Sequence, residues 1–146
     1  METQSSNPTA LAVERLLRAF NDRDWEAMAD SLDEDVEYRD RPLATVLRSP
    51  QEVVDWCRDG FVPFPDARLE DIRLITEGDR VASEFVERGT HTGPFEGPDG
   101  MLEPTGRTVE WRFCNVWRVG PSGKVIEAEA YYDQLDHLRQ LGIEAS

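Results

Sequence analysis

The chain has 146 residues and a formal net charge of −14 at pH 7. This length suits one domain that buries roughly two thirds of the surface its unfolded chain exposes. A surface this acidic repels phosphate backbones, which excludes nucleic acid as a partner. No apolar run approaches the roughly 18 residues that span a bilayer, so a membrane partner is excluded as well.

The cysteine and histidine content points away from disulfides and metals. Cys57 and Cys114 are the two cysteines, and the N-terminus lacks the basic and then apolar order of a secretory signal, so we expect free thiols and a cytoplasmic location. Two distant histidines without a Cys-x-x-Cys pair predict no metal site. The sequence also lacks a P-loop and a Gly-x-Gly-x-x-Gly between strand and helix, so no cofactor is expected.

Helical signals occupy the first third of the chain. Asn7 followed by Pro8 is an N-cap followed by a proline at the first helical position, and an apolar stripe follows at helical spacing. Asp24 is placed to cap a second, shorter helix. Ser49 and Glu52 form a capping box at the start of a third.

After the third helix the apolar period changes to two. Four segments alternate like strands, over residues 67–76, 81–91, 108–119 and 125–133. A short strand at 35–40 precedes the third helix, and a short helix ends at Gly142. These elements predict an α+β fold in which three N-terminal helices pack on one face of a curved antiparallel sheet. We expect a single domain over residues 1–146, with residues 1–6 as a flexible tail.

Asp40 stands at the end of the early strand, on the same face as Val36 and Tyr38. A carboxylate at the mouth of an apolar pocket has its charged form disfavoured, which raises its pKa toward the range useful for a general base. Two alternatives stay open. Arg39 or Arg41 can pair with Asp40 and keep it ionised, and a carboxylate at a strand end is often a turn or cap residue.

Asn115 interrupts an apolar face of the 108–119 strand. Its neighbours on that face are large and apolar: Val109, Trp111, Phe113 and Trp117. A buried amide needs a partner, because an unpaired polar group costs free energy in an apolar environment. The partner is either a backbone group or trapped water, or a ligand in a functional site.

The last strand places two alanines on one face and acids on the other. Ala128 and Ala130 leave room on the inner face, whereas Glu129 lies on the opposite, solvated face. Asp133 is expected to cap the final helix. His137 lies in that polar helix and is expected to be solvated.

The order of these elements resembles the SnoaL-like polyketide cyclase family, of the nuclear transport factor two-like superfamily. The most specific pieces are "GTHTG" at 89–93, "PTG" at 104–106, and the closing "YDQ" and "QLG". The resemblance implies a cone-shaped domain, a homodimer, and a Gly/Pro-rich segment near the open end of the cone. His91 lies in that segment, and it is either a pocket residue or a loop residue bonded to nearby backbone.

The resemblance carries over to single residues only in part. Cyclases and limonene-type epoxide hydrolases of this superfamily have an acid where this chain has Ala130. In comparison with the ketosteroid isomerases, Asp40 matches the general base and Asn115 the acid that donates to the oxyanion. The tyrosine of their first helix is replaced by Leu16.

These observations favour a cofactor-independent acid/base enzyme that abstracts a proton beside a carbonyl of a small, largely apolar or polyketide-like substrate, as in an isomerase, cyclase or lyase. Asp40 is the predicted base, with Asn115 and His91 as hydrogen-bond donors to the enolate. The predicted pocket walls are Tyr38, Trp56, Phe85, Trp111, Trp117 and Tyr132. The alternatives are a non-catalytic module that binds a small molecule and an epoxide hydrolase-like enzyme with an altered acid set.

Overall fold

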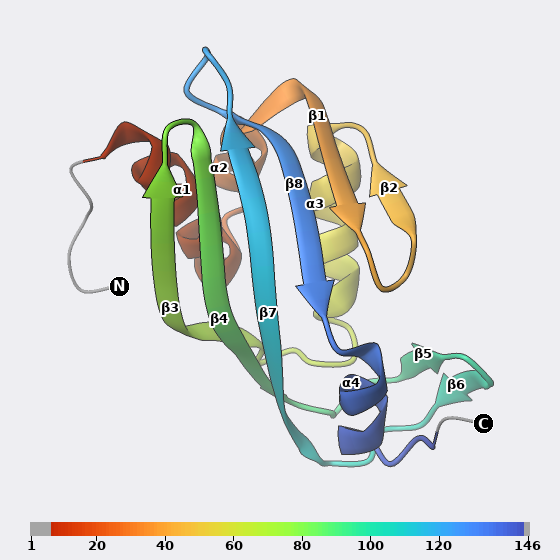
Figure 1. The fold of residues 1–146 in the computed structure, drawn as a ribbon. Coiled ribbons are helices and arrows are strands. Elements are labelled where there is room, and N and C mark those ends of the chain that lie inside the picture. Colours follow the sequence, from red (N-terminus) through yellow and green to blue (C-terminus); the bar gives the residue numbers. More distant parts are fainter. Residues whose placement is uncertain (1–6, 145–146) are drawn as a thin grey trace.

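A computed structural model describes residues 7–144, so the predicted tail at 1–6 lies outside the described residues. Four helices and eight strands form within this range (Figure 1): α1 (Pro8–Asp22), α2 (Trp25–Asp30), β1 (Leu32–Asp40), β2 (Thr45–Leu47), α3 (Pro50–Gly60), β3 (Arg68–Glu77), β4 (Arg80–Thr90), β5 (Phe95–Gly97), β6 (Gly100–Leu102), β7 (Thr108–Val119), β8 (Val125–Tyr132) and α4 (Gln134–Gln140). None of these helices is long and apolar enough to cross a bilayer.

The helix starts follow the capping residues of the sequence. The Asn7 side chain accepts hydrogen bonds from two backbone N–H groups of the first turn of α1. Asp24 accepts from Ala27 N at the start of α2, and Ser49 accepts from Glu52 N at the start of α3. These bonds satisfy backbone donors that a helix terminus leaves unpaired.

Six strands form one curved sheet in the order β2-β1-β8-β7-β4-β3, and α1, α2 and α3 cover one of its faces (Figure 1). The predicted α+β class and the helices packed on a curved sheet are confirmed. One pairing differs from the antiparallel prediction, because β1 runs parallel to β8. Strand β8 follows the β3–β4–β7 meander in the sequence and lies between β7 and β1 in the sheet.

The main hydrophobic core fills the space between the concave face of the sheet and the three helices. Val13 and Leu17 of α1, Met28 of α2 and Val81 of β4 are at most 2% exposed. A smaller cluster around Phe64 and Leu141 closes the lower end of the sheet, where α4 lies against β7. Between these two clusters the concave face is left open to a pocket.

The long segment between β4 and β7 is fastened at its base and carries the β5–β6 hairpin at its tip. His91 N donates to Arg107 O at 2.8 Å and Gly106 N donates to His91 O at 2.9 Å, which joins the two arms. The segment also docks on the α3–β3 loop, where Thr92 N and Gly93 N both donate to Pro63 O at 3.1 Å. The backbone of this stretch is thus docked directly on the backbone of the neighbouring loop.

Gly93 is the position where this docking leaves no room for a side chain. A Cβ atom at this residue would lie 1.9 Å from the carbonyl oxygen of Val62. We therefore expect Gly93→Ala to lower the free energy of unfolding by about 1–3 kcal/mol or more, since overpacking forces the backbone to move. Gly60→Ala is the matched control, because a Cβ there meets nothing within 4 Å. Urea denaturation measures both; equal stability of the two variants would show that the docking is not as tight as described.

Candidate active site

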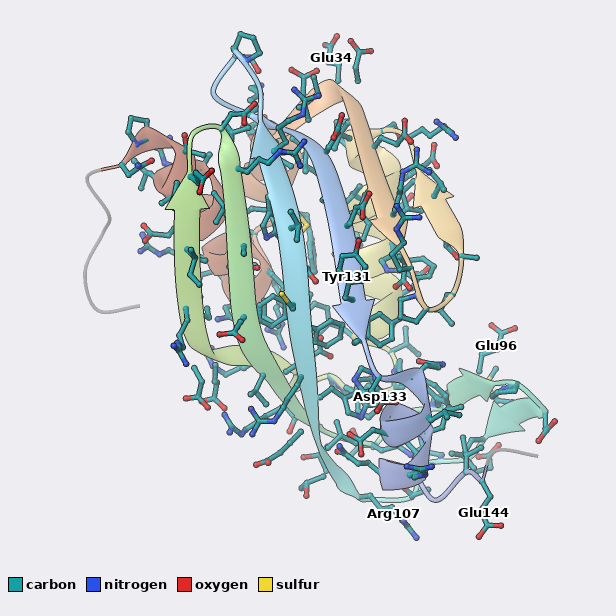
Figure 2. All side chains as sticks on the ribbon, viewed as in Figure 1. Glu34, Glu96, Arg107, Tyr131, Asp133 and Glu144 are labelled. Carbon is teal, nitrogen blue, oxygen red and sulfur yellow. The ribbon has the colours of Figure 1, made fainter. Side chains whose placement is uncertain are left out.

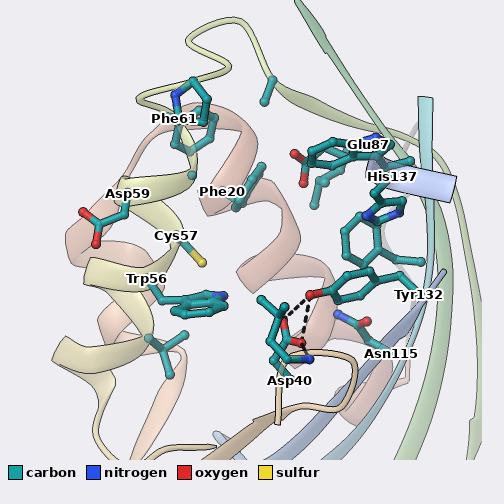
Figure 3. Close-up of a pocket in the computed structure, with 18 of the residues that line it drawn as sticks. Phe20, Asp40, Trp56, Cys57, Asp59, Phe61, Glu87, Asn115, Tyr132 and His137 are labelled. Atoms are coloured by element: carbon teal, nitrogen blue, oxygen red, sulfur yellow. Dashed lines mark hydrogen bonds between the residues drawn. The ribbon is translucent and has the colours of Figure 1, made fainter. Parts of the chain in front are cut away.

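A pocket of about 590 Å³ opens between the concave face of the sheet, α1, α3 and the β5–β6 hairpin (Figure 3). This volume is typical of small-molecule sites. All six predicted wall residues line it: Tyr38, Trp56, Phe85, Trp111, Trp117 and Tyr132. The predicted catalytic residues Asp40 and Asn115 line it too, and His91 does not.

Asp40 is the last residue of β1 and is 4% exposed. The Tyr132 hydroxyl donates toward both of its carboxylate oxygens at 2.8 Å (Figure 3). The backbone N–H of Leu43 donates to Oδ1 at 3.1 Å, so the carboxylate also anchors the β1–β2 turn. The sequence analysis gave a turn role and a pocket role as alternatives for Asp40, and in the structure Asp40 has both.

Neither neighbouring arginine neutralises Asp40. Arg39 pairs with Glu37, and Arg41 pairs with Glu129 at 2.8 Å on the outer side of the sheet. Within residues 7–144 no ion pair reaches Asp40. Burial therefore raises the pKa of Asp40, and the hydrogen bonds from Tyr132 and Leu43 offset part of that rise.

Asn115 lies in the same row of the sheet as Asp40. Ala130 of β8 is the register partner of Asp40 on one side and of Asn115 on the other. Neighbouring strands are about 4.8 Å apart, so the two polar side chains flank one small residue, Ala130, which is 0% exposed.

The Asn115 side chain is 3% exposed and bonds only partly within the protein. Burial raises the pKa of the neighbouring Tyr38 hydroxyl, and the Asn115 side chain acts on this hydroxyl with a smaller effect that lowers its pKa. The Oδ1 atom of Asn115 has no hydrogen-bond partner among the described residues. Asp40, Tyr132, Tyr38 and Asn115 thus form one polar cluster on an otherwise apolar surface.

His91 does not belong to this cluster, which corrects the hypothesis of a catalytic donor. It is fully buried at the base of the β4–β7 segment, where Nδ1 lies 2.9 Å from Thr105 Oγ1 and 3.1 Å from Thr105 N. Its ring packs near Phe64 and Phe95. Of the two alternatives for His91, the structure therefore shows a loop residue bonded to its neighbours. Its contacts with Thr105 join the two arms of the docked segment.

The expectation that His137 is solvated is wrong. The side chain is 4% exposed and its ring stacks between Trp111, at a centroid distance of 4.4 Å, and Tyr132, at 4.7 Å. Burial lowers the pKa of His137 to about 4, so the ring is neutral at pH 7. The helix is short and polar, but it lies against β7, and this contact between distant segments is invisible to local sequence patterns.

Glu87 is a pocket residue that the sequence analysis missed. It lies on β4 and follows Val81, Ser83 and Phe85 at alternate positions, so the period of the strand directs it to the concave face. Burial raises its pKa to about 7. The interruption of an apolar strand face by a charged residue was the signal, and it is the same signal that identified Asn115.

The other acids near the end of β8 have structural roles. Asp133 caps α4 through Asp136 N at 3.0 Å, as predicted. Glu129 binds Arg41 and accepts a hydrogen bond from Tyr131, which lies on the face of the sheet away from the helices (Figure 2). No group of three or more His, Cys, Asp or Glu side chains suited to a metal ion occurs in the described part of the chain.

Comparison with known proteins agrees with this architecture. Two solved structures share 26% of residues with this chain and cover 94% of it. One is AclR of Streptomyces galilaeus, described provisionally as a hydroxylase (TM-score 0.79, 83% of that chain covered). The other is IdmH of Streptomyces antibioticus, described provisionally as a polyketide cyclase (TM-score 0.80, 100% covered).

A SnoaL-like protein of Jannaschia is 17% identical, with a TM-score of 0.82 over 99% of this chain and 100% of the other, and shows the fold alone. A comparison with curated proteins finds no match. The family model of the SnoaL-like polyketide cyclases matches residues 10–141, from the first turn of α1 to the end of α4. The chain therefore belongs to the SnoaL-like polyketide cyclase family.

Proposed function

We propose that the protein is a cofactor-independent acid/base enzyme that abstracts a proton from the carbon beside a carbonyl of a small, largely apolar substrate. The observation that carries the proposal is the Asp40 carboxylate, which is 4% exposed, faces an aromatic pocket and has no ion-pair partner within residues 7–144. Such a carboxylate is a stronger base than an exposed one, because protonation relieves the cost of a buried charge.

The side chains around Asp40 orient its carboxylate and the substrate carbonyl. Tyr132 holds the carboxylate from one side with hydrogen bonds of 2.8 Å. A substrate carbonyl that enters between Asp40 and Asn115 meets the Asn115 side chain and the neighbouring Tyr38 hydroxyl. These groups are placed to donate to the oxygen on which negative charge develops, an effect that is worth about 3 kcal/mol per donor in other enzymes. The proton on Asp40 then returns to the substrate: to another carbon in an isomerisation, to the alkoxide oxygen that forms when the enolate closes a ring on a second carbonyl, or to the leaving group that departs in an elimination.

The test is α-proton exchange. The wild-type protein is incubated with 2-acetylnaphthalene in D₂O, and deuterium in the acetyl methyl group is followed by mass spectrometry. The proposal expects exchange well above the rate with heat-denatured protein. Binding without exchange would instead support a non-catalytic binding module.

We also propose that the protein acts as a homodimer through the outer face of the sheet. That face is not covered by α1, α2 or α3 (Figure 1), and its Tyr131 side chain is 44% exposed. Sheet faces left open in this way are commonly buried against a second subunit. Sedimentation at micromolar concentration is expected to give the mass of two chains, and a monomer alone would refute the proposal.

A further inference from the structure

Glu87 projects from the concave face of β4 into the pocket, toward Phe20 of α1 (Figure 3). Its register partners are Leu69 on β3 and Trp111 on β7, both apolar core residues. A glutamate at an inward position of a central strand costs free energy unless its carboxyl group finds a partner.

The protein itself supplies no such partner. Within residues 7–144 neither a hydrogen bond nor an ion pair reaches the Glu87 carboxyl group. Arg23, whose charge offsets part of the rise that burial causes in the pKa of Glu87, donates instead to Asn21 O and Pro65 O and lies over the ring of Phe61. The raised pKa keeps a large share of Glu87 protonated near neutral pH, and a protonated carboxyl group both donates and accepts hydrogen bonds.

Other polar atoms at this end of the pocket are also unpaired. Nε1 of Trp111 and Nε2 of His137, whose rings stack, are buried without partners among the described residues. Both residues line the pocket. Together with Glu87, the register partner of Trp111, they form a second group of polar side chains, which we call the distal cluster; it adjoins the cluster around Asp40, because His137 also stacks on Tyr132.

The backbone positions of Glu87 and Asp40 lie in different rows of the sheet. Glu87 pairs with Trp111, four residues along β7 from Asn115, which shares a row with Asp40. Four residues of a strand span about 14 Å. Burial raises the pKa of Asp40 without a contribution from Glu87, whereas the pKa values of Tyr38 and Tyr132 are raised by burial and also by the charge of Glu87, so the two clusters share one pocket. The apolar surface between them includes Phe85 and Phe113, whose rings stack at 5.3 Å.

We propose that Glu87 binds a second oxygen function of the substrate, a hydroxyl group, at the end of the pocket away from Asp40. The inference rests on the proposed function, since the carbonyl end is taken to lie at Asp40. It narrows the substrate class to flat, apolar molecules of two or more fused rings, or chains of that length, that carry a carbonyl at one end and a hydroxyl at the other. Glu87 is then a residue that determines specificity, and Asp40 remains the base.

The test uses a matched pair of ligands, 2-acetylnaphthalene and 6-hydroxy-2-acetylnaphthalene, whose Kd values are measured by calorimetry at pH 6. For the wild type we expect the hydroxylated probe to bind tighter than the parent. Glu87→Leu should reduce that preference about tenfold or more, because the hydroxyl group then loses its partner. Glu87→Gln should retain most of it, since an amide also donates and accepts.

Glu84→Leu is the matched control: Glu84 lies on the same strand and its side chain is 55% exposed. It should leave the preference unchanged. An unchanged preference in Glu87→Leu would overturn the proposal, as would a wild type that binds neither probe. A third probe, 6-aminomethyl-2-acetylnaphthalene, tests whether the site binds a cation instead. Tighter binding of this probe than of the hydroxylated one, with loss of the difference in Glu87→Gln, would overturn the proposal. Binding that follows the expected pattern without deuterium exchange would reject the catalytic function and leave the distal site intact.

Discussion

Replacing Asp40 with asparagine is expected to lower the rate of α-proton exchange by about two to four orders of magnitude. The amide keeps the shape of the carboxyl group and can still accept a hydrogen bond from Tyr132, but it cannot take a proton from carbon. The Kd of 2-acetylnaphthalene should change little, because the pocket walls are unaltered. Single-turnover exchange together with calorimetry separates these two effects.

The control for this substitution is Asp79→Asn, in the exposed hairpin turn between β3 and β4. It carries the same chemical change away from the pocket and should leave the exchange rate at the wild-type value. An Asp40→Asn protein that retains the full rate would show that another group is the base. If both variants lost α-proton exchange, the loss would be due to impaired folding and not to removal of the base.

Glu87→Gln is expected to stabilise the protein at alkaline pH and to leave it unchanged in acid. The pKa of Glu87 is raised from 4.5 to about 7 in the folded protein. Below pH 4.5 the carboxyl group is protonated in both the folded and the unfolded chain, so its titration contributes no difference. As the pH rises from 4.5 to 7 the unfolded chain ionises first, and the folded state loses up to about 3 kcal/mol relative to it.

The expected result is therefore a variant that is more stable than the wild type by up to about 3 kcal/mol at pH 8 and equal to it at pH 4. Asp40 and His137 titrate equally in both proteins, so the difference reports Glu87 alone. Glu84→Gln serves as the control and should show no comparable dependence on pH, since its carboxylate is mostly exposed. Urea denaturation across this pH range gives the values. A constant difference between Glu87→Gln and the wild type would contradict the burial of an ionisable Glu87.

The parts of the fold that the sequence predicts are those that local chemistry determines. Asn7, Asp24 and Ser49 cap helices in the structure as their positions in the sequence indicate. The change of apolar period after α3 predicts the β3–β4–β7–β8 strands, because alternation follows from one buried sheet face. The parallel pairing of β1 with β8 joins segments about ninety residues apart, and no local pattern encodes it.

The site is predicted in part for the same reason. Asp40 and Asn115 interrupt apolar faces, and a polar residue on a buried face needs a partner wherever the fold brings it. The same reasoning applied to β4 would have found Glu87. The sequence left His91 open between a pocket and a loop role and predicted a solvated His137, whereas the structure buries both and lets only His137 line the pocket. The docking of the β4–β7 segment and of α4 decides these surroundings, and both dockings depend on tertiary contacts.

The direct test of the central claim, that Asp40 is a buried base without a compensating cation, is its own titration. Carbon-13 NMR of the side-chain carboxyl group, assigned by comparison with Asp40→Asn, gives the pKa in the folded protein. We predict a value above the ordinary aspartate value of about 3.9, because burial outweighs the hydrogen bonds from Tyr132 and Leu43. A pKa at or below the ordinary value would show that the carboxylate is stabilised as an anion, and would contradict its assignment as the base.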